Sequence, residues 1–375
     1  MEYIIENMSG LGRTSKLKTK KLELRTPISW FALSNIESKS FQTKVFTKGS
    51  IESFLCNVYD LKFKDKKDHR RELVQTLKEM GLNSKCDSGG YQAMSKGVVL
   101  TQEEVAGYQI ELDCNLSIQL DHPLTLDIPS KEVMKRIDYN TKNLQTLVDK
   151  YRKTIQFVPT IHGHDSKTLD YSINSIKEIL GNHPKIVAIG SLVPLSLNSN
   201  IEKKKKIVDI LLYVRKKMPK TLLHILGMGG SMTYVGVYCG ADSFDSAGWA
   251  QKSGFGVIQL PGVSDRYIEK TPNGRRALDS DESIQFLDCN CPACKFYINN
   301  LLDYQGKGEN KRLLRAIHNL HLFQTEIEKI KRSISNDFLD EFVRARLKNS
   351  KWLSLIDYAK SKIAGSRKVT IDEFF

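Results

Sequence analysis

Asp245 is the residue whose sequence surroundings point most directly to chemistry. The hydrophobic run 221–226 meets a glycine-rich turn, and a short helical pattern over 231–239 stops at Gly240 before a second apolar segment leads to Asp245. This order predicts strand, helix, strand, with a carboxylate at the end of the second strand, where the active sites of parallel α/β proteins lie. The alternative is that Asp245 only caps a helix or turn.

Other predicted strands also end in polar groups. If neighbouring carboxylates share one pocket, repulsion and burial raise one pKa and leave the other group ionised. One carboxylate then serves as nucleophile or cation stabiliser and another shuttles a proton, which is the arrangement that breaks glycosidic bonds. For the histidine among these groups, the alternative is a strand-end residue with satisfied hydrogen bonds. The candidates are Asn57, Asp87, Ser88, Asp121, His162, Gly190, Ser191 and the Leu226–Gly227 turn.

Three of the seven cysteines form the motif Cys289-x-Cys291-x-x-Cys294. With a fourth ligand from His318 or His321 downstream, the motif predicts a closed structural zinc site. The odd cysteine count and a reducing compartment argue against disulfides; the alternative is free buried thiols. The remaining cysteines are expected to be isolated core residues: Cys56, Cys86, Cys114 and Cys239.

The periodicity of the chain predicts an α/β fold, a (β/α)8 TIM barrel with a zinc-binding subdomain and C-terminal helices. No GxGxxG follows the first strand, so a dinucleotide-binding fold lacks its main signature. A capping box at 101–104 marks one of the helices. Strands are expected at 28–33, 51–56, up to 87, 116–120, 155–161, 186–189, 222–226 and 241–245, and helices at 68–80, 130–152, 167–180, 200–218 and 231–239.

The predicted barrel is flanked on both sides. Residues 1–26 are expected to form a hairpin or arm, residues 27–335 the barrel with a zinc subdomain at 286–335, and residues 336–375 a basic helical tail. Within the second half, 254–262 predicts a short strand leaving the barrel, 271–276 a polar turn and 311–334 a long amphipathic helix.

The formal net charge of +14 predicts a polyanionic partner, because each lysine or arginine that neutralises a phosphate releases a counterion. The alternative is an ordinary solvated surface. No signal-peptide core and no apolar run near 20 residues is seen, so a cytoplasmic protein without a membrane segment is expected. Basic residues gather at 13–25, 62–71, 203–206, 307–315 and 344–351.

Four motifs, in order, resemble the tRNA-guanine transglycosylase family. The segment DSGGYQ at 87–92 resembles the family signature DSGGFQ, and FDS at 244–246 resembles its nucleophile segment. The cysteine motif with HNL at 318–320 resembles its zinc site, and NVY at 57–59 is similar to its NTY. The similarity runs from about residue 26 to 334.

The resemblance implies roles for individual residues. Asp245 is the nucleophile that attacks the anomeric carbon and expels guanine, and Asp87 is the general acid/base. Asp121 reads the base edge, Tyr91 stacks on the base, Leu226 covers its other face, and Ser191 and Leu192 offer backbone contacts. The zinc ligands are Cys289, Cys291, Cys294 and His318.

The chain departs from the family at two places. His162-Gly163 replaces the usual Gln-Gly, so a different donor contacts the base oxygen. Residues 246–252 differ from the bacterial tRNA enzymes, and Ala-Gly-Trp249 with 257–262 looks most like the DpdA-type branch, which inserts a 7-deazaguanine, usually 7-cyano-7-deazaguanine, into DNA. DNA is therefore the expected partner, with Trp249 helping to hold an extruded nucleotide.

Two alternatives remain. The first is the same base exchange on tRNA, and the second is a noncatalytic nucleic-acid-binding subunit, a reading that predicts loss of Asp87 or Asp245, both of which are present. Partner DNA-modification proteins that open the duplex, and a homodimer, are further expectations of the resemblance.

Overall fold

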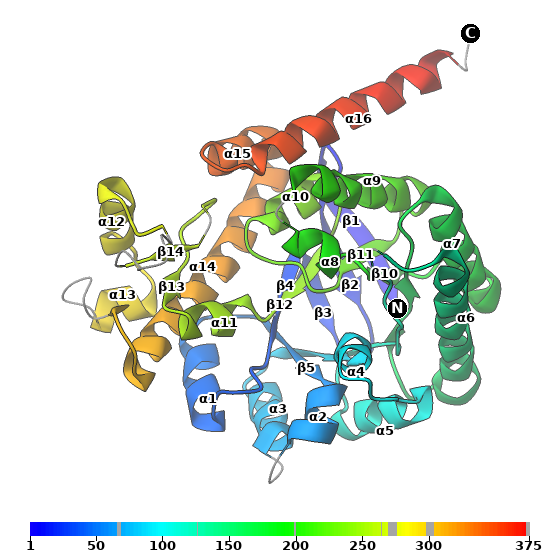
Figure 1. Ribbon diagram of the computed structural model, residues 1–375, viewed down its shortest axis with the longest axis horizontal. Coiled ribbons are helices and arrows are strands. Elements are labelled where there is room, and N and C mark those ends of the chain that lie inside the picture. The colour runs from blue at the N-terminus through cyan, green and yellow to red at the C-terminus, as the bar shows by residue number, and fades with distance from the viewer. Residues whose placement is uncertain are drawn as a thin grey trace.

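A closed parallel barrel forms the centre of the computed structural model, which describes residues 1–65, 69–125, 127–198, 200–263, 265–268, 276–297 and 304–372. The predicted (β/α)8 fold is confirmed (Figure 1). Residues 271–275 of the expected polar turn lie outside the described part. The strands follow the order β8-β7-β6-β5-β4-β12-β11-β10-β9; they are β4 (Ile28–Ala32), β5 (Ser53–Asn57), β6 (Asn83–Asp87), β7 (Leu116–Ile118), β8 (Phe157–Val158), β9 (Thr160–Ile161), β10 (Ile186–Ile189), β11 (Leu222–Ile225) and β12 (Ser243–Ser246).

The barrel closes across Pro159. The sequence predicts one continuous strand over 155–161, but proline has no N–H for a ladder hydrogen bond, and the segment divides there into β8 and β9. β8 pairs with β7 and β9 pairs with β10, while the Pro159 carbonyl accepts a hydrogen bond from the Ala188 N–H at 2.9 Å. The two halves therefore fill one strand position, and the predicted count of eight positions holds.

Helices surround the barrel on its outer side (Figure 1). The capping box is confirmed: Thr101 Oγ1 accepts from the Glu104 N–H, and Glu104 accepts from the Thr101 N–H. Gly240 adopts φ +89°, the left-handed conformation that ends the helix before β12. The helices are α1 (Lys39–Lys48), α2 (Val58–Lys64), α3 (His69–Glu79), α4 (Gly90–Ser95), α5 (Gln102–Leu112), α6 (Ser130–Thr146) with the π-helix Leu147–Tyr151, α7 (Ser166–Leu180), α8 (Val193–Leu197), α9 (Ile201–Lys217), α10 (Met232–Tyr238) and α11 (Gly248–Gly254).

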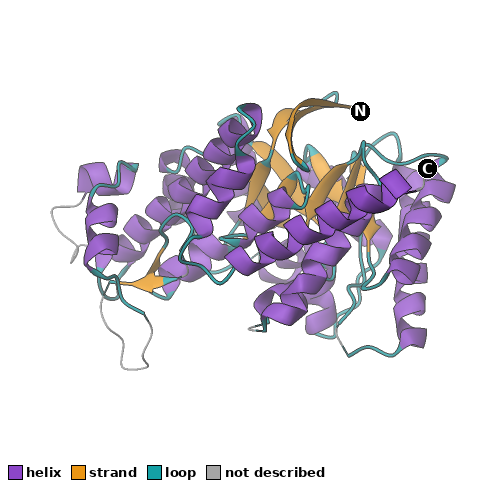
Figure 2. Ribbon diagram, turned by 90° about the horizontal axis from the view of Figure 1, so that it is seen from above, coloured by secondary structure: helices purple, strands orange, loops and turns teal. Residues whose placement is uncertain are grey.

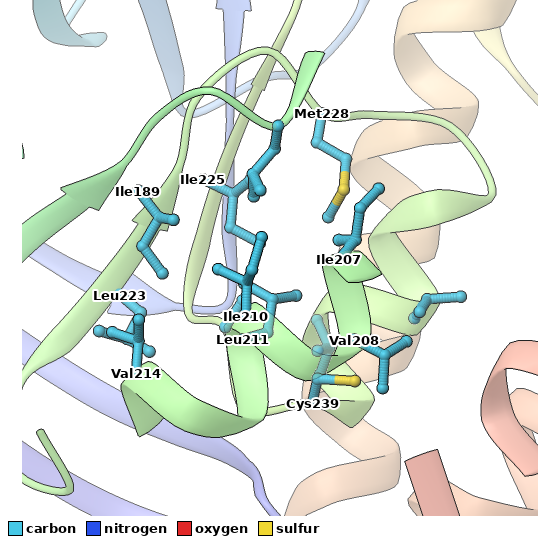
Figure 3. Packing of buried hydrophobic residues seen from close by; sticks show 14 of the residues in the cluster. Ile189, Ile207, Val208, Ile210, Leu211, Val214, Leu223, Ile225, Met228 and Cys239 are labelled. Atoms are coloured by element: carbon cyan, nitrogen blue, oxygen red, sulfur yellow. The ribbon is translucent and has the colours of Figure 1, made fainter. Parts of the chain in front are cut away.

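One apolar face of α9 packs against β10 and β11, the two strands that precede β12 and Asp245 in the chain. Ile207, Leu211 and Val214, spaced by about one helical turn, are fully buried and pack with Ile189 and Leu223 in one cluster (Figure 3). Burying each of these side chains contributes roughly 1.5–3 kcal/mol. This packing holds β10 and β11 against the helix, so their carboxyl ends are set in place.

The N-terminal segment is a three-stranded antiparallel sheet rather than a simple arm. It consists of β1 (Glu2–Ser9), β2 (Gly12–Lys18) and β3 (Glu23–Thr26). Its Leu17 and Leu24 share a buried cluster with Ile28, Ile186 and Leu222, which are the first residues of their strands. The sheet therefore covers the amino end of the barrel and leaves the carboxyl end for ligands.

The residues after the barrel form a lobe beside it and a helical segment across it (Figures 1 and 2). α14 packs on α11 and α1, and α16 packs on α9. Among the described residues, no helix has the length and apolar character that crossing a membrane requires. The elements are β13 (Val257–Ile258), β14 (Arg266–Tyr267), α12 (Ser280–Leu287), α13 (Pro292–Tyr297), α14 (Glu309–Ser335), α15 (Leu339–Leu347) and α16 (Leu353–Asp372).

Candidate active site

Asp245 lies on β12 and points into the carboxyl end of the barrel, where both of its carboxylate oxygens are held. Oδ1 accepts a hydrogen bond from the Gly227 N–H at 2.5 Å. Oδ2 lies 2.8 Å from Lys85 Nζ and 2.9 Å from His224 Nε2. Gly227 adopts φ +70°, and a Cβ there would meet Val193 at 2.4 Å, so the turn that presents this N–H requires glycine.

The charge of Lys85 keeps Asp245 ionised. Burial alone raises the pKa of Asp245, but the Lys85 ammonium and the hydrogen bond from His224 outweigh burial and lower the pKa well below its ordinary value of 3.8. In turn, burial lowers the pKa of Lys85 and the charge of Asp245 opposes that shift. The pair is 1% and 7% exposed, so the two charges face each other with little solvent between them.

A chain of hydrogen bonds behind Asp245 fixes the orientation of His224. Its Nδ1 lies 2.9 Å from Ser243 Oγ, and Trp30 Nε1 donates to the same Ser243 oxygen at 2.9 Å. Burial and the nearby Lys85 charge lower the pKa of His224 to about 4. The imidazole is therefore neutral near pH 7, and Lys85 is the cation that balances Asp245.

Asp87 ends β6 and has the opposite electrostatic surroundings. Its Oδ2 accepts from Asn57 Nδ2 at 2.7 Å and from the Gly89 N–H at 3.3 Å. Burial, followed by the charges of Asp121 and Asp245, raises the pKa of Asp87 to about 7, against the opposing charge of Lys85. Asp87 is therefore poised to give and take a proton near neutral pH.

Asp121 completes the set of three carboxylates at the mouth. Ser88 Oγ donates to its Oδ1 at 3.1 Å. The backbone of Asp121 passes so close to Gly90 that a Cβ there would meet the Asp121 carbonyl oxygen at 2.1 Å. Gly90, the second glycine of the DSGGYQ segment, thus brings the start of α4 against Asp121.

His162 directly follows β9, and its ring packs between Ser191 and Asp121. Its side chain is 0% exposed, with Nδ1 2.7 Å from Ser191 Oγ and Nε2 3.3 Å from Asp121 Oδ2. The contact of His162 with the base oxygen stays a prediction, and the structure places its ring against Asp121 and Ser191. A Cβ at Gly190 would meet the His162 ring at 2.3 Å, so glycine is required there for the ring to fit.

The burial of Trp249 corrects the expectation that its side chain helps to hold a nucleotide. Its indole is 0% exposed, its Nε1 donates to the Ala32 carbonyl at 2.9 Å, and Phe46 packs edge-on at 5.4 Å. The side chain therefore anchors α11 to β4 and has no surface to offer a nucleotide. Tyr91, by contrast, is 41% exposed. Leu226 is partly buried and directly precedes Gly227, whose N–H bonds to Asp245. The Leu192 side chain is buried in the core.

The predicted cysteine motif and His318 come together with metal-site geometry. His318 Nδ1 lies 3.5, 3.6 and 3.4 Å from the Sγ atoms of Cys289, Cys291 and Cys294. A tetrahedral zinc with Zn–S of about 2.3 Å and Zn–N of about 2.0 Å requires about 3.5 Å between sulfur and nitrogen. His318 Nε2 donates to the Gln259 carbonyl at 2.9 Å, which leaves Nδ1 free to bind a metal. This set could hold zinc; His321 is not part of it.

Three of the cysteines expected to be isolated lie together. The thiol sulfurs of Cys56, Cys86 and Cys114 are within 4.8 Å of one another in the core, with 3.7 Å between Cys56 and Cys114. They are buried, as predicted, but they pack on one another because β5, β6 and the turn before β7 are neighbours. Cys239 is buried within the cluster around α9.

In the basic run 203–206, one of the lysines is buried. Lys204 is 2% exposed, and its Nζ donates to the Ser196 carbonyl and lies 4.6 Å from the centre of the Trp352 ring. Burial lowers its pKa to about 8. The run 203–206 therefore offers fewer charges to a polyanion than the sequence indicates.

Sequence reasoning missed Lys85 and His224. Both lie inside strands, two residues before Asp87 and two before Leu226. A signal existed: each is a polar side chain within a short, otherwise buried strand, and Lys85 is on the same strand face as Asp87 because side chains alternate. Their partner Asp245 is 160 and 21 residues away, so spacing alone did not connect them.

Comparison with known proteins places most of the chain in one family. The family described as "Queuine tRNA-ribosyltransferase" matches residues 8–351. Among curated relatives, the tRNA-guanine(15) transglycosylase of Pyrococcus abyssi is 27% identical over 360 residues, covering 93% of this chain and 57% of that protein. The proteins of the same name from Pyrococcus furiosus and Methanosarcina mazei are each 27% identical, covering 93% and 89% of this chain and 57% and 65% of their own lengths. The chain thus spans less than two thirds of these relatives.

Proposed function

The chain belongs to the queuine tRNA-ribosyltransferase family, and we propose that it is a guanine transglycosylase, a pentosyltransferase that exchanges guanine in a nucleic acid through a covalent Asp245 intermediate. The observation that carries the proposal is the pair of carboxyl groups at one barrel mouth. Asp245 has a lowered pKa and Asp87 a pKa of about 7. Groups with such divided pKa values supply a nucleophile and a general acid/base.

In the first half of the reaction, Asp245 displaces the base. A bond forms between one carboxylate oxygen of Asp245 and the anomeric carbon, while the bond from that carbon to the base nitrogen breaks and its electron pair leaves with the base. Asp87 gives its proton to the departing guanine. In the second half, the incoming base attacks the anomeric carbon, Asp87 accepts the proton that the base loses, and the electron pair of the ester bond returns to Asp245.

The remaining mouth residues bind the base in this proposal. The Asp121 carboxylate accepts N–H groups of the guanine edge, supported by Ser88 and by His162 behind it. The exposed Tyr91 ring stacks on the base, and Leu226 covers its opposite face. Backbone groups of Ser191 and Leu192 complete the pocket, and Asn57 holds Asp87 in position.

Zinc has a structural role in the proposal. Three thiolates and one imidazole fill a tetrahedral ion and leave no open position for a substrate, so the ion joins α13 to α14 instead of taking part in the reaction. Asn319, next to His318, accepts from the Gln259 N–H and donates to the Val257 carbonyl. The zinc site is thereby connected to β13 beside the barrel.

For the polymer, we propose DNA as the substrate and a 7-deazaguanine, 7-cyano-7-deazaguanine in the first place, as the incoming base. The support is the likeness of Ala247–Trp249 and 257–262 to the DNA-acting branch, together with the net charge of +14. Because Trp249 is buried, its part in this likeness concerns the packing of α11, not contact with a nucleotide. The alternative is tRNA, which the names of the relatives favour.

The test is base exchange with both polymers offered side by side. Purified wild-type protein is incubated with duplex DNA, single-stranded DNA and tRNA, with labelled guanine or labelled 7-cyano-7-deazaguanine, and the label in each polymer is counted. Label in DNA that depends on Asp245 supports the proposal. Label in tRNA alone establishes the alternative, and binding without exchange under every condition favours a noncatalytic subunit. Single-stranded DNA tests whether a partner protein is needed to open the duplex.

A further inference from the structure

Lys85 is a buried lysine that the reaction described so far does not use. It is 1% exposed, although lysine is almost never fully buried unless it is paired. Its position on β6 places it on the barrel-facing side together with Asp87, while Cys86 between them faces the outer core. A costly charge has therefore been placed beneath the proposed reaction centre.

The contacts of Lys85 single out one oxygen of Asp245. Nζ lies 2.8 Å from Oδ2 and also contacts His224 Nε2, and it lies 5.4 Å from the centre of the Trp30 ring. The other oxygen, Oδ1, accepts a hydrogen bond from the Gly227 N–H. We therefore expect Oδ1, at the turn, to bond to the anomeric carbon, and Oδ2, which the two buried side chains hold, to remain the carbonyl oxygen of the ester.

We propose that Lys85 is a catalytic residue that makes Asp245 a good leaving group when the covalent intermediate breaks down. This inference rests on the proposed function. In the ester, Asp245 carries no charge and the Lys85 ammonium stays buried without its counterion. When the bond from Oδ1 to the anomeric carbon breaks, its electron pair returns to the carboxylate and restores the ion pair. Lys85 therefore favours the free carboxylate over the ester and speeds the second half of the reaction.

The charge, and not just the shape, of Lys85 carries this effect. His224 is neutral beside the charged Lys85, because burial and the Lys85 charge lower its pKa to about 4, so Lys85 supplies the positive charge next to Asp245. A preorganised charge next to the site where negative charge develops is worth more in a buried site than in water, and removal of one such group costs about 10²–10³-fold in rate.

The experiment compares Lys85→Met with Lys204→Met. Both lysines are buried, at 1% and 2% exposure, but Lys204 donates to the Ser196 backbone carbonyl and not to Asp245, so the second variant controls for loss of a buried lysine. Each protein is incubated with nucleic acid in the absence of incoming base, and the denaturation-stable protein–nucleic acid adduct is measured. Incoming base is then added, and decay of the adduct is followed.

We expect Lys85→Met to accumulate more adduct than wild type and to release it about 10²-fold more slowly on addition of base. As the pH is lowered, the exchange rate of Lys85→Met is also expected to begin to fall at a higher pH than that of wild type, because Asp245 has lost the cation that keeps it ionised. Lys85→Arg, which keeps the charge, restores part of the release rate. Lys204→Met behaves as wild type.

Two failures are distinguishable. If wild type exchanges base but Lys85→Met matches it in adduct level, release rate and pH profile, the proposal for Lys85 is wrong and the proposed function stands. If wild type forms no adduct and exchanges no base in DNA or tRNA, both proposals fail. A folding defect is recognised by thermal unfolding: Lys85→Met combined with Asp245→Asn is expected to be more stable than Lys85→Met alone, because the unpaired buried carboxylate is then removed.

Discussion

Asp245 and Asp87 end two strands at the same barrel mouth, yet their surroundings drive their charges apart. On β12, Asp245 faces a buried ammonium, a neutral imidazole and a backbone N–H. On β6, Asp87 receives one amide donor from Asn57 and a longer backbone contact, and it feels the charges of two other carboxylates. Burial is the largest single influence on both, and it acts in the same direction.

The difference shows that burial does not decide the role of a carboxyl group; the nearest cation does. Lys85 is on the same strand face as Asp87, but its Nζ reaches across the barrel to Asp245. One lysine thus keeps one aspartate ionised while it opposes the raised pKa of the other only in part. Substituting each aspartate separately therefore tests whether the two groups have the different roles that their pKa values indicate.

The largest effect is expected for Asp245→Asn, which keeps the shape but removes the nucleophile. Base exchange falls by at least about 10³-fold and no covalent adduct forms, because an amide oxygen is a poor nucleophile. Exchange of labelled guanine and adduct formation are both measured. Full exchange with a trapped adduct in this variant contradicts the assignment of Asp245.

Asp87→Asn is expected to have the next largest effect. The amide keeps contact with its neighbours but cannot move a proton, and general acid/base catalysis contributes about 10²–10⁴-fold. We expect exchange to slow by about that factor, while binding of the nucleic acid, measured by titration, stays close to wild type. An unchanged exchange rate would contradict the assignment of Asp87 as the general acid/base.

The pH dependence sharpens the comparison. Because the pKa of Asp87 is about 7, the proton needed by the leaving base is present below pH 7 and is lost above it. Single-turnover formation of the adduct is therefore expected to decline about tenfold per pH unit above pH 7. In Asp87→Asn this decline is absent, and an identical decline in both proteins assigns it to another group.

The smallest effect concerns stability. The fold raises the pKa of Asp87 from an ordinary 3.8 to about 7, so the native state binds this proton more tightly than the unfolded state. Stability from this group is present in full below about pH 4 and is lost as the pH rises through about 7. The Tm of Asp87→Asn relative to wild type should therefore increase over this range by roughly 5 °C, because about three pKa units correspond to about 4 kcal/mol. A Tm difference that does not change with pH argues against the raised pKa.

Much of the fold was open to prediction from local patterns. Apolar runs separated by helical periodicity indicated a barrel, because such patterns depend on neighbours in the chain. The capping box at Thr101 and the helix stop at Gly240 were predictable for the same reason. The break at Pro159 had a local cause as well, although the apolar run around it suggested one strand. The N-terminal sheet was predicted only as a hairpin or arm, since its third strand pairs with the second and not with the barrel.

The sequence by itself determined that Asp87, Asp121 and Asp245 stand at strand ends and that three cysteines share one short motif, because these features lie in single segments. The tertiary structure decided which groups face one another. The ion pair of Lys85 with Asp245 joins residues 160 positions apart, and the burial of Trp249 and His162 depends on strands and helices that pack around them. Charge and burial at a site are sums over neighbours in space, and the barrel brings those neighbours from every part of the chain.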